Sequence, residues 1–136
     1  MVEKLKFSKM VTQQKALERL IREYEKYGKL YIAFDFDSTI FDYHNEGLNC
    51  CDVISLLKEC SELGHVMILL TATSNEERLT FMRLYCKHFG INVKYVNENP
   101  EVGDKTVKPY YNILLDDRAG LEESYLVLRE TIKHFK

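Results

Sequence analysis

The strongest constraint on the fold lies in residues 31–39, which read Tyr-Ile-Ala-Phe-Asp-Phe-Asp-Ser-Thr. An apolar run of this length is typical of a buried strand, and Asp35, Asp37 and Thr39 would then follow the end of that strand. In a parallel α/β sheet, the carboxyl ends of the strands carry the chemistry. Two carboxylates this close together repel each other unless a cation holds them, and Mg²⁺ with oxygen ligands is the simplest such cation. The sequence therefore predicts a magnesium site at a strand end.

The rest of the chain alternates between helical and strand patterns. The spacing of apolar residues predicts helices over 9–27, 50–63, 75–89 and 120–135, and apolar runs predict strands over 30–34, 66–70, 93–96 and 111–115. Ser74 and Glu77 form a capping box that opens the third helix. This order predicts an α/β fold, a three-layer αβα sandwich with a parallel, Rossmann-like sheet. No linker or repeat interrupts it, so we expect one domain over 1–136, with an N-terminal helical extension (1–28) and a core (29–136).

Composition excludes several classes of protein. Hydrophobic residues make up 46% of the chain and charged residues 29%, which suits a globular protein. The net charge of -2 provides no overall basic field that would attract nucleic acid. The four cysteines have neither redox nor zinc spacing. No apolar run approaches the ~18 residues of a membrane span, and no signal peptide is present, so we expect a cytoplasmic protein without membrane contact.

The Asp-x-Asp-x-Thr spacing at a strand end resembles the first motif of the haloacid dehalogenase superfamily, whose members are mostly magnesium-dependent phosphatases. Three further features follow in the order of that family, over residues 29–132. The resemblance implies that Asp35 is a nucleophile that forms an aspartyl-phosphate. It implies that Asp37 is the general acid and base, with a metal contact through its backbone carbonyl. Taken alone, both residues would read equally well as turn or cap residues.

The second and third motifs would bind the phosphate. Thr71 follows the strand 66–70 beside a helix N-terminus, where its hydroxyl would hold a phosphate oxygen. We expect Thr39 and Ala72 to lie against the substrate as well. The third motif is a lysine that neutralises the nucleophile and the phosphate. Lys108 is favoured because Lys-Pro before the fourth strand resembles the family pattern, and Lys105 remains the alternative.

The fourth motif is the acidic pair Asp116 and Asp117 after the strand 111–115. With Asp35 and Asp37, this pair would complete the magnesium site. Arg118 could instead pair with one of the two carboxylates. The Asp-Asp-Arg sequence resembles the phosphatase domain of polynucleotide kinase-phosphatases, which suggests a nucleotide or a nucleic-acid end as the phosphorylated substrate.

The intervals where large members of the superfamily carry a cap domain are short here. Residues 38–49 and 97–107 leave room only for loops, so the chain resembles an uncapped member. An open site suits a macromolecular end, a large nucleotide, or a small substrate that an oligomer partner encloses. The loop residues that could touch such a substrate are Asp42, Tyr43, His44 and Asn45.

Together, these motifs and the resemblance predict a magnesium-dependent phosphatase that cleaves a phosphomonoester. Two alternatives remain open at this point. A protein of the same fold could bind a nucleotide, a signalling molecule or a protein partner with little or no turnover. The aspartyl-phosphate could also transfer its phosphoryl group to an acceptor other than water. The sequence leaves the identity of the substrate and the oligomeric state open.

Overall fold

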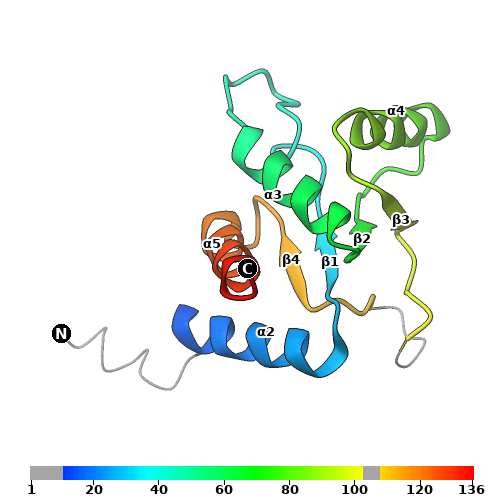
Figure 1. The fold of residues 1–136 in the computed structure, drawn as a ribbon. Coiled ribbons are helices and arrows are strands. Elements are labelled where there is room, and N and C mark those ends of the chain that lie inside the picture. Colours follow the sequence, from blue (N-terminus) through cyan, green and yellow to red (C-terminus); the bar gives the residue numbers. More distant parts are fainter. Residues whose placement is uncertain (1–10, 103–107) are drawn as a thin grey trace.

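The computed structural model describes residues 11–102 and 108–136, which form helices and parallel strands in alternation (Figure 1). The elements are α2 (Gln13–Tyr27), β1 (Tyr31–Phe34), α3 (Cys51–Glu62), β2 (Val66–Leu69), α4 (Glu76–His88), β3 (Val93–Val96), β4 (Ile113–Leu115) and α5 (Leu121–His134). None of the helices described is long and apolar enough to cross a membrane.

The four described strands form one parallel sheet in the order β3-β2-β1-β4. Phe34, the last residue of β1, lies opposite Leu69 of β2 on one side and Leu115 of β4 on the other. The three strands therefore end at the same level, and the residues that follow them meet at one edge of the sheet. The predicted α/β fold with a parallel sheet, flanking helices and an N-terminal helix is confirmed.

The main hydrophobic core joins the helices to one face of the sheet. Each helix contributes buried residues to it, and the strands contribute alternate side chains, as a pleated strand requires. Full burial of one such side chain contributes roughly 1.5–3 kcal/mol. In Figure 1, α3 and α5 lie in front of the sheet and α2 runs along its lower end. The side chains from the helices that anchor this core include Leu20, Leu57, Met82 and Leu128.

The opposite face of the sheet carries a smaller cluster, built around Ala33, Val66 and Ile68. The partly buried side chains that pack on it come from the strands and the residues next to them: Tyr31, Leu70, Tyr95, Tyr111 and Leu114. Within the described residues, this layer is made by side chains without a helix. The connection between β3 and β4 holds both prolines of the chain, and proline disfavours a helix interior.

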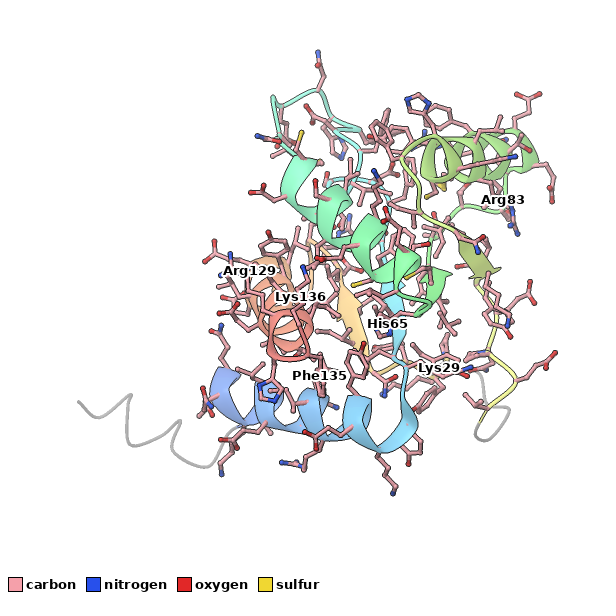
Figure 2. All side chains as sticks on the ribbon, viewed as in Figure 1. Lys29, His65, Arg83, Arg129, Phe135 and Lys136 are labelled. Atoms are coloured by element: carbon pink, nitrogen blue, oxygen red, sulfur yellow. The ribbon has the colours of Figure 1, made fainter. Side chains whose placement is uncertain are left out.

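His65 fastens the beginning of β2 to the beginning of β1 (Figure 2). The backbone N–H of Leu30 donates to His65 Nδ1 at 2.9 Å, so the ring carries its proton on Nε2. Nε2 is buried and has no hydrogen-bond partner among the described residues. The ring packs edge-on against Tyr24 at a centroid distance of 4.8 Å. Burial lowers the pKa of His65 below its ordinary value of 6.5.

Several predicted boundaries differ from the structure. Helix α2 begins at Gln13 because Thr12 caps it, with its side chain accepting from Lys15 N; the earlier residues of the predicted helix, 9 and 10, lie outside the described residues. The prediction that Ser74 caps the third helix is wrong. Asn75 caps α4, with its side chain accepting from Arg78 N at 2.9 Å.

The fourth strand is shorter than predicted, since β4 begins at Ile113 rather than at residue 111. The side-chain oxygen of Asn112 accepts from the backbone N–H of Tyr31 at 2.6 Å. The Asn112 side chain therefore accepts a hydrogen bond that a backbone carbonyl would accept in a regular strand pair.

Candidate active site

A cavity of about 1210 Å³ opens at the carboxyl ends of the strands. Its walls come from the segments that follow β1, β2, β3 and β4 and from the first turn of α4. In Figure 1 this region lies at the top of the sheet, between α4 and the loop that leads into α3. Segments far apart in the sequence meet here because the parallel strands end together.

Three carboxylates meet in this cavity. Asp35, Asp116 and Asp117 each offer an oxygen atom, and these atoms lie within 4.8 Å of one another. Because Phe34 is paired with Leu115, the next residues on the two strands, Asp35 and Asp116, are neighbours across the sheet. Three hard oxygen donors at this separation fit a small divalent cation such as Mg²⁺. The structure thus brings together the three predicted metal ligands that would bind through their carboxylates, and the backbone-carbonyl contact of Asp37 stays a prediction.

The environment of Asp35 disfavours its charged form. Burial, with the negative charge of Asp116 as the next cause, raises the pKa of Asp35 from 3.8 to about 7, and Asp117 adds to the rise. The backbone N–H of Phe36 opposes the rise by donating to the carboxylate. A divalent cation among the three carboxylates would favour the ionised form that a nucleophile needs.

Thr39 supports the acidic cluster from behind. Its side chain is buried and does not line the cavity. The hydroxyl donates to Asp35 Oδ2 at 3.5 Å and accepts from the backbone N–H of Asp117 at 3.2 Å. Thr39 therefore links the candidate nucleophile to the acidic pair. The structure places it as a support for the cluster, whereas the sequence predicted a contact with the substrate.

Asp37 lines the cavity and forms an ion pair with Arg78 of α4. It does not belong to the group of three carboxylates described above. The contact joins Arg78 Nη2 to Asp37 Oδ1. Arg78 itself lies among aromatic rings, with its guanidinium 4.8 Å from the centroid of Tyr43 and 5.7 Å from that of Phe81.

Arg78 was missed by sequence reasoning. The only sequence signal was a basic residue three positions after the helix-capping Asn75, on the turn that faces the strand end. Arg118 also lines the cavity and is exposed. These two arginines supply positive charge on the cavity wall, and guanidinium groups match the geometry of phosphate oxygens.

Polar groups at the end of β2 form a second part of the wall. Thr71 and Ala72 both line the cavity, as predicted for residues near the substrate. The backbone N–H of Thr71 donates to Asn97 Oδ1 at 2.8 Å, which fixes the turn after the strand. The α4 N-terminus follows, and the positive end of a helix favours a bound anion.

Lys108, the favoured lysine of the third motif, does not line this cavity. Lys108 lines a separate cavity of about 750 Å³ between α2, the residues before β4, and the start of α5. Lys105 lies outside the described residues. The structure therefore does not bring Lys108 together with the acidic cluster.

The loop after β1 forms an internally bonded rim. The carboxylate of Asp42 accepts from the backbone N–H groups of Glu46, Gly47 and Leu48 at 2.8–3.1 Å. These bonds lower the pKa of Asp42, with the bond from Glu46 as the largest cause. Asp42 therefore stabilises the conformation of the loop. Tyr43 and His44, from the same loop, line the cavity.

No family model matches this chain, and no curated protein matches it. A solved structure of a conserved protein from Bacteroides thetaiotaomicron is similar to it, with 25% sequence identity and a TM-score of 0.61. The similarity covers 79% of this chain and 93% of that chain. It supports the fold and carries no information about activity.

Proposed function

We propose that this chain is a magnesium-dependent phosphohydrolase of the haloacid dehalogenase type, acting on a phosphomonoester. The observation that carries the proposal is the meeting of Asp35, Asp116 and Asp117, with oxygen atoms within 4.8 Å of one another, in a cavity that Asp37 also lines. Carboxylate oxygens are hard donors that suit Mg²⁺, and the carboxyl end of a parallel sheet is where such sites form. When bound, Mg²⁺ would neutralise the carboxylates and polarise the phosphoryl oxygens.

The proposed reaction has two steps on the chain's own residues. In the first, a carboxylate oxygen of Asp35 attacks phosphorus, and the ester P–O bond breaks as Asp37 gives its proton to the leaving oxygen. In the second, water attacks the aspartyl-phosphate and gives a proton to the Asp37 carboxylate. The bond between phosphorus and Asp35 then breaks, releasing inorganic phosphate and restoring both side chains.

Phosphate binding in this proposal falls to groups that line the cavity. Thr71, the backbone around Ala72 and the α4 N-terminus face it, and Arg78 and Arg118 supply charge. The role of a lysine stays a prediction for Lys105. The size and openness of the cavity suit a nucleotide or a nucleic-acid end, with the exposed ring of Tyr43 available for contact.

Two observations favour the alternative of a binding module with little turnover. The candidate acid and base, Asp37, is engaged by Arg78, and the favoured lysine, Lys108, lies at another cavity. A protein that binds a phosphorylated ligand without turnover would tolerate both features.

The test is phosphate release from an aryl phosphate and a nucleotide panel, with Mg²⁺ and with chelator. Wild type is compared with Asp35→Asn, which keeps the shape of the side chain and removes the nucleophile. Release that requires both Mg²⁺ and Asp35 would support the phosphohydrolase. Equal release from wild type and Asp35→Asn would refute it, and nucleotide-dependent thermal stabilisation without release would favour the binding module.

A further inference from the structure

Arg78 connects the candidate acid–base residue to a cluster of aromatic rings. Its guanidinium forms the ion pair with Asp37, and four rings lie 4.8–5.8 Å from the guanidinium carbon. Three of these rings, Phe36, Phe41 and Phe81, pack on one another, with centroid distances of 5.4–6.0 Å. Contacts with four rings restrict the orientations that the guanidinium can adopt.

The loop that carries Asp37 is held to α4 by the same cluster. Tyr85 of α4 donates its hydroxyl hydrogen to the backbone carbonyl of Ile40 at 2.8 Å. Within the loop, the N–H of Ser38 donates to the carbonyl of Phe41 at 2.7 Å, and Ser38 has a positive φ of 62°. The backbone that follows Asp37 is therefore fixed, which leaves the rotation of the Asp37 side chain to be set.

Arg78 has the geometry to set that rotation. It contacts Asp37 through Oδ1, and this leaves Oδ2 for the oxygen of a leaving group. The side chain of Arg78 is only 26% exposed, so the ion pair is partly shielded from water. A partly buried charge pair restrains a carboxylate more strongly than a solvated one does.

The geometry points to Arg78 as a positioning residue that orients the Asp37 carboxyl for proton transfer to the leaving group. This inference rests on the proposed phosphohydrolase function. It assigns a purpose to the aromatic cluster between α4 and the loop after β1, since that cluster holds the guanidinium in place. The negative charge that develops on Asp37 as its proton leaves would be stabilised by the same contact.

The experiment compares two phosphomonoesters that differ in their need for an acid. p-Nitrophenyl phosphate releases a stable phenolate without protonation, whereas an alkyl phosphate releases an alkoxide that requires a proton. General acid catalysis contributes about 10²–10⁴-fold to such reactions. We expect Arg78→Ala to lower kcat/KM for the alkyl phosphate about tenfold or more beyond its effect on p-nitrophenyl phosphate, because kcat/KM reports the first step, whereas hydrolysis of the aspartyl-phosphate is common to both esters.

The matched control is Arg83→Ala, which removes the same charge from the same helix. Arg83 is exposed and lines a different cavity near the end of β3, and Figure 2 shows it below α4, at the right of the view. We expect this variant to hydrolyse both esters as the wild type does. Arg78→Lys is the second test variant, because it keeps the charge and most of the packing but loses the planar fork. This variant should lose less activity than Arg78→Ala, and its loss should again be larger on the alkyl phosphate than on p-nitrophenyl phosphate.

A double-variant comparison ties the effect to Asp37. Asp37→Asn should show the same selective loss, and adding Arg78→Ala to it should lower the rate on the alkyl phosphate little further. Equal losses on both esters would overturn the inference. A raised KM with unchanged kcat would also overturn it, because Arg78 would then be a phosphate-binding residue. Absence of magnesium-dependent turnover in the wild type would instead overturn the proposed function itself.

Discussion

The acidic cluster makes a prediction that can be tested without knowing the substrate. Asp35, Asp116 and Asp117 lie within 4.8 Å of one another through their nearest oxygen atoms, so in the absence of a cation they repel each other. We expect Asp116→Asn to stabilise the protein in chelator and to weaken its response to Mg²⁺. Asparagine keeps the side-chain oxygen that accepts from the backbone N–H of Arg118 at 2.9 Å, so the substitution removes charge with little change of shape.

The size of the effect follows from the separation of the charges. Two unit charges 4.8 Å apart repel by ~0.9 kcal/mol in water and by ~3.5 kcal/mol at an effective dielectric constant of 20. Because the cluster is partly solvated, the lower end applies, and removal of the Asp116 charge relieves about 1–2 kcal/mol. In a chain of this length that corresponds to a rise of about 3–8 °C in Tm.

Mg²⁺ should stabilise Asp116→Asn less than it stabilises the wild type, which opposes the gain in stability expected in chelator. At a concentration of 100 times Kd, a bound cation stabilises the wild type by about 2.7 kcal/mol. A tenfold loss of affinity on removing one carboxylate would take away about 1.4 kcal/mol of that stabilisation. Asp116→Asn is therefore more stable than wild type in chelator and loses that advantage in Mg²⁺.

The assay is thermal unfolding followed by circular dichroism at pH 8, in chelator and in a Mg²⁺ titration. Although the pKa of Asp35 is raised to about 7, a pH of 8 lies above it, so Asp35 is mostly ionised. The repulsion between the carboxylates is then near its full value. Glu101→Gln serves as the control, since it removes an exposed carboxylate from the segment after β3. A lower Tm for Asp116→Asn in chelator, together with an unchanged Mg²⁺ response, would refute the reasoning.

Three further predictions concern stability. Relative to His65→Asn, which keeps an acceptor for Leu30 N, the wild type should lose free energy of unfolding in urea titrations as the pH drops from 7.5 to 5.5, because burial lowers the folded-state pKa of His65 and the unfolded chain takes up that proton first; a difference between the two proteins that does not change with pH would contradict this. Asn75→Ala should cost about 1 kcal/mol in urea unfolding because it removes the α4 cap, whereas Ser74→Ala should change little; equal costs would restore Ser74 as the cap. Met82→Ala, at a fully buried position of α4, should cost about 2–5 kcal/mol, against less than about 0.5 kcal/mol for the exposed Leu84→Ala, and similar costs would show that α4 is not packed as described.

The sequence predicted most of the fold because the patterns that define it are local. The strands are short and mostly apolar, and the predicted strand at 93–96 matches β3 at both ends. The helix ends were less predictable, since Ser74 and Asn75 are both good caps and the choice between them depends on which side chain reaches a free backbone N–H. The beginning of β4 was missed because a side chain, that of Asn112, takes part in the pairing with β1.

The candidate site was predictable only in part. The acidic residues follow directly from strand ends, and parallel register brings Asp35 and Asp116 together. The positions of the basic side chains could not be predicted in the same way, because they depend on how helices and loops pack on the sheet. Lys108 lines the cavity beside α2, while Arg78 reaches Asp37 from α4 through a cluster of rings contributed by two separate segments. Periodicity along the chain carries no information about such contacts.

The pairing of β1 with β4 has a consequence for the kinetics of folding. Tyr31 and Asn112, which join the two strands at their beginning, are 81 positions apart along the chain. Closing so long a loop is slow, and the acidic cluster cannot form until it has closed. We therefore expect the cluster, and any divalent cation that it holds, to be in place only after the main folding barrier has been crossed. Such a cation would lengthen the lifetime of the folded protein against spontaneous unfolding while leaving the rate of refolding nearly unchanged.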